Sequence, residues 1–240
     1  MVKRVLIAVL ALTIVTVTVS ALSEGMDENN DAAAVNTDSG VIIIDAGHGG
    51  FDGGAVAHDG TLEKDLNLEV ALELERHAKA LGYKTVMVRT TDRATDSDGE
   101  QSGTKKLKDL KNRLALMNKY KNSIFISIHM NKYSTSQPNG TQVFYSPFNG
   151  SKELAKGIQC SVASMLQPNN KRVVKVATRD IYLLHNATRP AVIVECGFLS
   201  NPNDLANLKQ KNYRNELAFA ILCGIMVNGS QNSDISTQNL

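Results

Sequence analysis

Residues 41–48 are Val-Ile-Ile-Ile-Asp-Ala-Gly-His, a short apolar and mostly β-branched run that ends on a histidine. Two later runs have the same form: residues 124–129 are Ile-Phe-Ile-Ser-Ile-His, and residues 191–195 are Ala-Val-Ile-Val-Glu. Runs of this kind, bounded by polar segments, are typical of buried strands in a parallel sheet. Ligands bind outside the carboxyl ends of the strands in open α/β sheets. We therefore expect the two histidines and the glutamate to meet at one edge of one sheet.

Between residues 40 and 228 the apolar pattern alternates between strand-like and helix-like segments. Further strands are predicted at 85–88, 141–145 and 173–176, and helices at about 62–81, 107–120, 152–166 and 213–227. This alternation favours an α/β fold, a three-layer αβα sandwich with a twisted, mostly parallel sheet flanked by helices.

The two ends of the chain differ from this body. A lysine and an arginine precede an apolar stretch, so residues 1–22 are predicted to be a signal peptide or an N-terminal membrane anchor. Either one implies export across the cytoplasmic membrane, with membrane contact through this segment alone. Residues 23–39 are polar and are predicted to be a flexible linker, and residues 229–240 are predicted to be a polar tail. Residues 40–228 then form one domain.

The charge of the chain is close to balanced. It carries 26 Lys and Arg against 24 Asp and Glu, a formal net charge of +2, and Lys3 and Arg4 alone account for the excess. A near-neutral body argues against nucleic acid as a partner. One basic cluster is predicted to be a solvated helix face, formed by Lys105, Lys106, Lys108, Lys111 and Arg113.

A metal site is the chemistry that the strand ends favour. Glu63 falls in the first turn of the helix predicted at about 62–81, which follows a glycine-rich loop at 47–54. It is therefore expected near the end of the strand that begins at residue 41. His48, Glu63 and His129 would supply three protein ligands to zinc and leave a fourth position open for water. Glu195 would take the proton of that water and deliver it to a leaving amine. Asp45 is expected to orient a ligand histidine as a hydrogen-bond acceptor.

Each residue alone also has an ordinary explanation. A histidine after a strand is more often structural, a glutamate favours any helix N-terminus, and Glu195 could pair with a buried arginine. The glycine-rich loop at 47–54 does not match a dinucleotide motif, because Asp52 stands where the third glycine would be. Cys196 lies beside Glu195 and is predicted to be a small core side chain, with a weaker alternative as a nucleophile. The convergence of four residues is what favours the metal site.

Four motifs together resemble one known family. They are Asp-Ala-Gly-His-Gly-Gly at 45–50, Glu-Lys at 63–64, Ser-Ile-His-Met-Asn at 127–131 and Pro-Ala-Val-Ile-Val-Glu-Cys-Gly-Phe-Leu-Ser-Asn at 190–201. In this order they are similar to the motifs of the zinc-dependent N-acetylmuramoyl-L-alanine amidases of the amidase 3 type, over about residues 40 to 228. The resemblance implies hydrolysis of the amide between N-acetylmuramic acid and the L-alanine of the stem peptide in peptidoglycan.

The resemblance also implies roles for individual residues. By analogy with the family, His48, Glu63 and His129 carry Zn²⁺, and Glu195 is the catalytic carboxylate. Three further positions match the family's pattern and are expected to contact substrate or to support the ligands, namely Asn67, Arg113 and Asn131.

Within the family, the chain most resembles the germination-specific, spore-cortex amidases. It is short, it carries a signal or anchor without an appended wall-binding domain, and it has the Glu-Cys-Gly-Phe form of the last motif at 195–198. This implies action in the forespore intermembrane space on the way to muramic-δ-lactam, and an accessory lipoprotein as a partner. The cell-division members insert a helix that blocks the metal site, for which residues 130–140 leave no room. Control is then expected from expression, metal loading or a partner.

Two other functions compete with this hypothesis. A non-catalytic peptidoglycan-binding or activator module on the same fold would need a broken metal set, and the sequence shows no break. A secreted metallopeptidase acting on the stem peptide would be expected to carry the His-Glu-x-x-His helix signature, which is absent.

Overall fold

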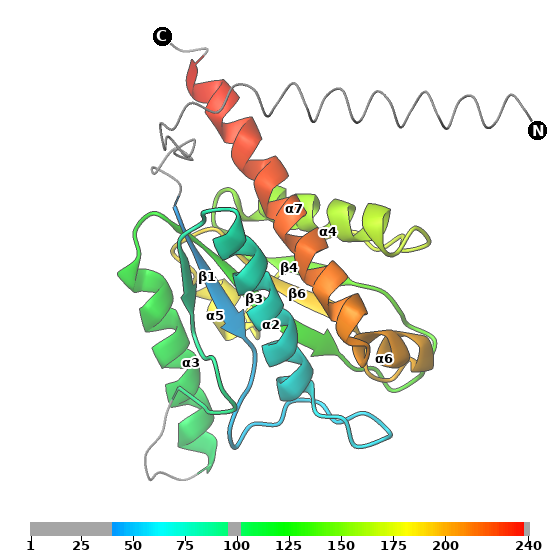
Figure 1. Ribbon diagram of the computed structural model, residues 1–240. Coiled ribbons are helices and arrows are strands. Elements are labelled where there is room, and N and C mark those ends of the chain that lie inside the picture. The colour runs from blue at the N-terminus through cyan, green and yellow to red at the C-terminus, as the bar shows by residue number, and fades with distance from the viewer. Residues whose placement is uncertain (1–39, 96–101, 238–240) are drawn as a thin grey trace, which may run out of the picture. The chain divides into compact units, whose positions relative to one another are not determined.

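The computed structural model describes residues 40–95 and 102–237 (Figure 1). The predicted signal or anchor at 1–22, the linker at 23–39 and the last three residues of the chain lie outside the described residues. Within the described part, no helix combines the length and the apolar character needed to cross a membrane.

The described residues contain one six-stranded sheet in the order β2-β1-β3-β6-β4-β5. Its strands are β1 (Val41–Ala46), β2 (Thr85–Met87), β3 (Ser123–Asn131), β4 (Gln142–Tyr145), β5 (Lys175–Val176) and β6 (Ala191–Phe198). β1 pairs in parallel with β2 and β3, and β3 pairs in parallel with β6. β4 runs antiparallel to β6 and parallel to β5. The predicted mostly parallel sheet is confirmed, although the strand expected at 173–176 is only two residues long.

Helices cover both faces of this sheet. They are α2 (Glu63–Ala80), α3 (Ser102–Lys119), α4 (Ser151–Met165), α5 (Tyr182–His185), α6 (Pro202–Leu208) and α7 (Lys211–Thr237). Figure 1 shows α2 and α7 in front of the strands, where they share one core with α4 and α6. α3 and α5 contribute to a second core on the other face.

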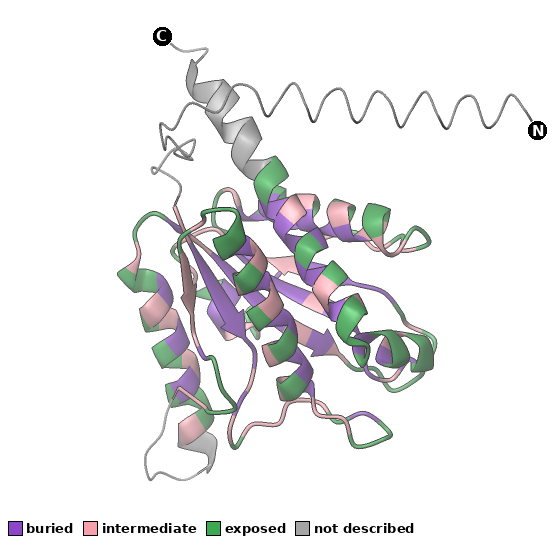
Figure 2. Cartoon of the chain, viewed as in Figure 1, coloured by how far each residue is buried: buried purple, intermediate pink, exposed green. Residues whose placement is uncertain are grey.

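The strands alternate between these two cores, residue by residue. Along β1, Ile42 and Ile44 pack in the core that contains α2 and α7, whereas Ile43 packs in the core that contains α5. On β3, Ile128 packs in the core that contains α2 and α7, and Phe125 packs in the core that contains α5. Because side chains of a strand alternate in direction, a strand covered on both faces must be apolar throughout. This explains the continuous apolar runs in the sequence and confirms the three-layer αβα sandwich, whose buried inner surfaces appear in Figure 2.

Helix boundaries depart from the expectations in several places. α5 and α6 were not expected, and α3 begins at Ser102, before the start predicted near residue 107. The sequence nevertheless contains a start signal for α6. The Asn201 side chain accepts hydrogen bonds from the backbone N–H groups of Asn203 and Asp204, and Pro202 takes the first helical position. α7 continues to Thr237, past the end near residue 227. The polar turns of α3 and α7 lack the apolar periodicity that locates a helix.

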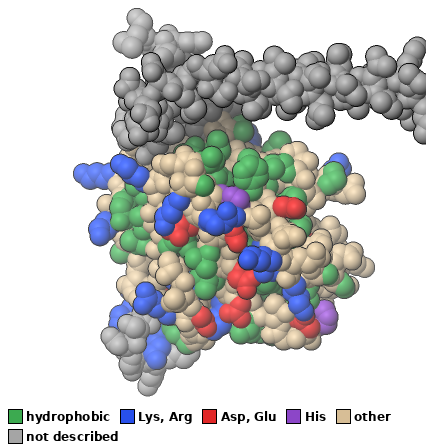
Figure 3. All heavy atoms as spheres, in the orientation of Figure 1, with side chains coloured by type: hydrophobic (Ala, Val, Ile, Leu, Met, Phe, Trp, Pro, Cys, Tyr) green, Lys and Arg blue, Asp and Glu red, His purple; other side chains and the backbone are tan. Residues whose placement is uncertain are grey.

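The outer face of α2 is charged with both signs. Exposed ion pairs join Glu73 to Arg76 at 2.7 Å and Glu75 to Lys79 at 2.8 Å. Figure 3 shows basic and acidic side chains interspersed over the face that contains this helix. Exposed pairs of this kind contribute only about 0–1 kcal/mol each, so the core rather than the surface holds α2 in place.

Strand register then sets the position of the functional edge. Ala46 of β1 pairs with Ile128 of β3, and His129 pairs with Glu195 of β6. The carboxyl ends of three adjacent parallel strands therefore lie side by side, as expected from the sequence. The loop that leaves β1 and the first turn of α2 adjoin this edge.

Candidate metal site at the sheet edge

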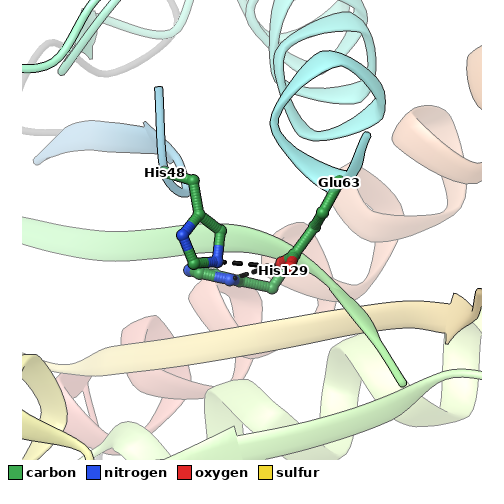
Figure 4. A group of neighbouring side chains, drawn as sticks. All are labelled: His48, Glu63 and His129. Carbon is green, nitrogen blue, oxygen red and sulfur yellow. Dashed lines mark hydrogen bonds and ion pairs between the residues drawn. The ribbon is translucent and has the colours of Figure 1, made fainter. Parts of the chain in front are cut away.

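Two histidines and a glutamate from three different elements meet at this edge (Figure 4). His48 Nε2 lies 3.2 Å from one carboxylate oxygen of Glu63, and His129 Nδ1 lies 2.9 Å from the other. The two imidazole rings are edge to face, with centroids 4.9 Å apart. One ligand atom from each residue can be chosen so that all lie within 4.8 Å of one another. The structure thus brings the three predicted ligands together.

Glu63 is held by the start of α2 and by the end of β3. It is buried at the first position of the helix, where its backbone N–H donates to Ala55 O at 2.9 Å. Its Oε1 accepts from the backbone N–H of Met130 at 3.1 Å, and its Oε2 accepts from that of Ala55 at 2.8 Å. Two main-chain donors therefore fix the carboxylate between the histidines.

Glycines next to the three predicted ligands make room for the side chains of those residues. A Cβ on Gly47 would lie 2.2 Å from His129 Nε2, and a Cβ on Gly54 would lie 2.6 Å from Glu63 Oε2. Both distances are below any real contact, so only glycine fits without displacing a ligand. The sequence predicted close backbone approach here, around substrate and metal, and the groups approached are the ligand side chains.

His48 is oriented through its second ring nitrogen. Its Nδ1 lies 2.9 Å from Asp52 Oδ2, and backbone hydrogen bonds of 2.9 and 3.1 Å between Gly49 and Asp52 hold the turn that places this carboxylate. In the neutral ring, a carboxylate acceptor at Nδ1 fixes the proton there and leaves the Nε2 lone pair for a metal. The expectation that Asp45 has this role is wrong, because its carboxylate accepts from Arg113 and from Ser127 Oγ instead.

Arg113 is buried, with 2% of its surface exposed, and it does not belong to the solvated helix face predicted for the basic cluster. It donates to the Asp45 carboxylate and, at 2.6 Å, to His48 O. Helical periodicity explains the error, because Asp109 and Arg113 share the inner face of α3 and pair at 2.7 Å. Lys106 of the same cluster is exposed.

Two predicted asparagines also lie at this edge. Asn67 is buried and donates to Gly47 O at 3.1 Å and to Glu63 Oε1 at 3.3 Å, so it joins two ligand-bearing segments. Asn131 is half-buried at the end of β3, where its main-chain oxygen accepts from Leu199 N at 2.8 Å.

Glu195 stands beside His129 in the neighbouring strand. The residue is half-buried, and its Oε2 is buried without a hydrogen-bond partner among the described residues. Burial raises the pKa of its carboxyl to about 7, although the neighbouring His129 opposes the rise. Cys196 is fully buried as predicted, and burial raises the pKa of its thiol. A nucleophilic cysteine needs its thiolate, so this residue does not fit that role.

The charges in the site favour a cation between the ligands. Burial alone would lower the pKa of His48, but hydrogen bonds to Asp52 and Glu63 raise that pKa to about 9. Burial alone would raise the pKa of Glu63, but His129 and His48 hold it well below its usual range. An anionic carboxylate between two imidazoles is a donor set that suits Zn²⁺. The residues present therefore fit a metal ion.

Comparisons with known proteins agree with one another. The profile of a family described as N-acetylmuramoyl-L-alanine amidase matches residues 42–227. The germination-specific N-acetylmuramoyl-L-alanine amidase of Bacillus subtilis is 34% identical over 188 residues, which cover 78% of this chain and 78% of that protein. The CwlD amidase of Clostridioides difficile, solved in complex with the GerS lipoprotein, is 36% identical with a TM-score of 0.77, over 80% of this chain and 98% of that one. An N-acetylmuramoyl-L-alanine amidase from Clostridium difficile 630 is 29% identical with a TM-score of 0.66, over 79% and 96% of the two chains.

Proposed function

The chain belongs to the N-acetylmuramoyl-L-alanine amidase family, amidase 3, and on this premise we propose that it is a zinc-dependent hydrolase of spore-cortex peptidoglycan. The bond cleaved is the amide between N-acetylmuramic acid and the L-alanine of the stem peptide. One observation carries the proposal: His48, Glu63 and His129 converge at a sheet edge next to Glu195, one of whose carboxylate oxygens is buried without a hydrogen-bond partner among the described residues.

The chain's own residues divide the work between holding a metal and moving a proton. His48 Nε2, His129 Nδ1 and the Glu63 carboxylate are the assigned ligand atoms, and Asp52 keeps His48 in the tautomer that can bind. A zinc ion held there would polarise the scissile carbonyl and lower the pKa of a water molecule. Glu195 accepts a proton from the attacking water as the new C–O bond forms. It then gives that proton to the L-alanine nitrogen as the C–N bond breaks.

The position of Glu195 supports this assignment. Strand pairing places it next to His129, and one of its oxygens is buried without a partner in the described part of the chain. An unpartnered buried carboxylate oxygen costs free energy, so it is expected where substrate or water supplies the partner. Asn67 and Arg113 bond to groups of the site itself, which supports a role in holding the ligands. Asn131 is half-buried at the same edge, and we assign it to substrate contact.

The likeness to the germination-specific amidase of Bacillus subtilis supports a role in cortex modification that germination needs. The site of action is then outside the cytoplasmic membrane, in the forespore intermembrane space. The similar amidase of Clostridioides difficile was solved with a lipoprotein, which supports an accessory lipoprotein as a partner here. Residues 132–141, between β3 and β4, contain no helix that could cover the site, so control is assigned to expression, metal loading or that partner.

Digestion of cortex peptidoglycan by the purified full chain with zinc tests the function. Mass spectrometry should detect free stem peptides that begin with L-alanine, and bare muramic acid in the glycan. L-alanine that stays attached to muramic acid would instead indicate a peptidase. Binding without release, by the zinc-loaded chain together with a lipoprotein partner, would favour the non-catalytic module.

Glu195→Gln separates the proton-transfer role from metal binding. The variant should bind one zinc per chain and lose about 10²- to 10⁴-fold in turnover, because the amide cannot accept the proton of water. Asp204→Asn is a control, since Asp204 is a partly buried carboxylate that accepts from the backbone of Phe198 and Gly140. Turnover by Glu195→Gln within threefold of the unaltered chain would rule out the proposed role.

A further inference from the structure

Arg89 lies two residues after the end of β2, and its guanidinium donates to backbone oxygens. The residue is 2% exposed. Its Nε donates to Ala46 O at 2.8 Å, and its Nη1 donates to Thr91 O at 3.1 Å. Its Nη2 donates to Gly47 O at 3.0 Å and to Lys64 O at 2.7 Å. Every nitrogen of the group is therefore engaged with the main chain.

The two carbonyl oxygens that accept from Nη2 belong to residues next in sequence to two of the assigned ligands. Gly47 precedes His48, and Lys64 follows Glu63. One nitrogen of Arg89 thus joins the loop that carries the first ligand to the helical turn that carries the second. Because Gly47 also lies against the ring of His129, a shift of this peptide would disturb all three ligands.

Burial of the Arg89 guanidinium among carbonyl oxygens costs free energy. Packing alone therefore does not explain why an arginine stands at this position. Among the described residues, the hydrogen-bond partners of Arg89 are backbone oxygens and include no carboxylate. Burial and the nearby Arg113 guanidinium lower the pKa of Arg89, and the carboxylates of Asp45, Asp92 and Asp65 offset only part of that lowering. A buried guanidinium with only carbonyl partners keeps much of its desolvation penalty. Arg214, by contrast, is 9% exposed and combines a bond of 2.6 Å to Leu208 O with an ion pair to Glu69.

We infer that Arg89 is a positioning residue that fixes His48 and Glu63 relative to each other and thereby sets the affinity of the site for its metal. The inference rests on the proposed metal site. A planar fork is required, because its donors must reach Ala46 O, Gly47 O and Lys64 O at the same time. A lysine is a single point charge and cannot reproduce that pattern.

Zinc affinity of the full chain, measured by competition with a chromophoric chelator, tests the inference. Arg89→Lys should weaken zinc binding about 10- to 100-fold, the range typical for partners that orient metal ligands. Arg214→Lys is the matched control, a second buried arginine that donates to a backbone carbonyl. Both substitutions should lower the Tm of the metal-free chain, whereas only the change at Arg89 should move zinc affinity and the rate of zinc release.

Two further variants keep the outcomes distinct. Arg89→Gln removes the charge and serves where a lysine ammonium prevents folding, and the same loss of affinity is expected for it. His48→Ala should abolish binding. If the Arg89 variants bind zinc as tightly as the unaltered chain while His48→Ala does not, Arg89 is only structural and the inference is overturned. If His48→Ala also retains tight binding, the proposed metal site itself is wrong.

Discussion

The two histidines of the site are held by opposite means. His129 belongs to β3, which is hydrogen-bonded to β1 on one side and β6 on the other. His48 lies beyond the end of β1 with φ of 60°, and it is the one non-glycine residue with positive φ in the part that the structure describes. A left-handed conformation at such a residue costs about 1–3 kcal/mol and persists only where its surroundings impose it. The sheet fixes one proposed ligand, whereas side chains from other elements fix the other.

Those side chains bind the loop along its length. Arg113 donates to His48 O at 2.6 Å, and Lys64 Nζ donates to Gly50 O at 2.9 Å. Asp92 accepts from Gly50 N at 2.8 Å and pairs with Lys64 at 2.7 Å. This loop lies beyond the end of β1, and charged side chains supply hydrogen bonds to its backbone. Those hydrogen bonds hold His48 in position although it belongs to no helix or strand. The predictions below compare the strand-held ligand with the loop-held ligand.

Loss of either histidine should have the largest effect. His48→Ala and His129→Ala should each abolish stoichiometric zinc binding, measured by dialysis and elemental analysis, because two remaining ligands hold the ion poorly. His58→Ala is the control, an exposed histidine of the same loop region that should leave one zinc per chain. One zinc per chain in either ligand variant would show that the assignment of that histidine is wrong.

Gly47→Ala, a change in the loop after β1, should displace the ring of His129, the ligand that β3 holds. The added Cβ would meet the His129 ring, so the free energy of unfolding should fall by about 1–3 kcal/mol and zinc affinity should fall with it. Gly53→Ala is the control, because a Cβ there has Leu62 as its nearest neighbour at 3.8 Å. Denaturant unfolding and zinc titration of both variants measure the two effects. Equal free energies of unfolding and equal zinc affinities in Gly47→Ala and Gly53→Ala would contradict the steric explanation.

Asp52→Asn should weaken only the loop-held ligand. The amide can still bond to Nδ1 but no longer favours the required tautomer, so zinc affinity should fall about 10- to 100-fold. Asp59→Asn is the control, since Asp59 is an exposed carboxylate that pairs with Lys209 at 2.6 Å. Affinity of Asp52→Asn within twofold of the unaltered chain would mean that the backbone alone orients His48.

Removal of the metal should produce the smallest and most local change. A chelator should increase amide hydrogen exchange in residues 48–54 more than in residues 124–130, because the sheet hydrogen bonds of β3 persist without zinc. Exchange that rises equally in both segments would remove the distinction between the two ligands.

Sequence patterns predicted which residues meet at the sheet edge, but not the groups that hold the loop on which His48 lies. Strand ends and one helix start were enough to place His48, His129, Glu195 and Glu63, because apolar runs indicate where parallel strands stop. The groups that hold the loop leave no such pattern. Asp52 was noted only as a missing glycine, and Arg89 was not identified at all.

Errors in the prediction have the same physical origin. The basic pattern assigned Arg113 to a solvated face because its neighbours are lysines, although the family resemblance assigned it to the site, and Asp45 was paired with a histidine because it precedes one in the chain. Both residues bond to groups brought close by tertiary structure, 65 to 82 positions apart in sequence. A single sequence has no periodic signal for hydrogen bonds between a side chain and a group that is distant in the chain.

Anomalous diffraction at the zinc edge, from crystals of the full chain grown with zinc, tests the central claim most directly. The account predicts one strong peak about 2.0–2.2 Å from His48 Nε2, His129 Nδ1 and a Glu63 oxygen, with Glu195 near the ion but outside bonding distance. A peak bonded to Glu195 in place of one of these ligands, or a peak elsewhere on the chain, would contradict it.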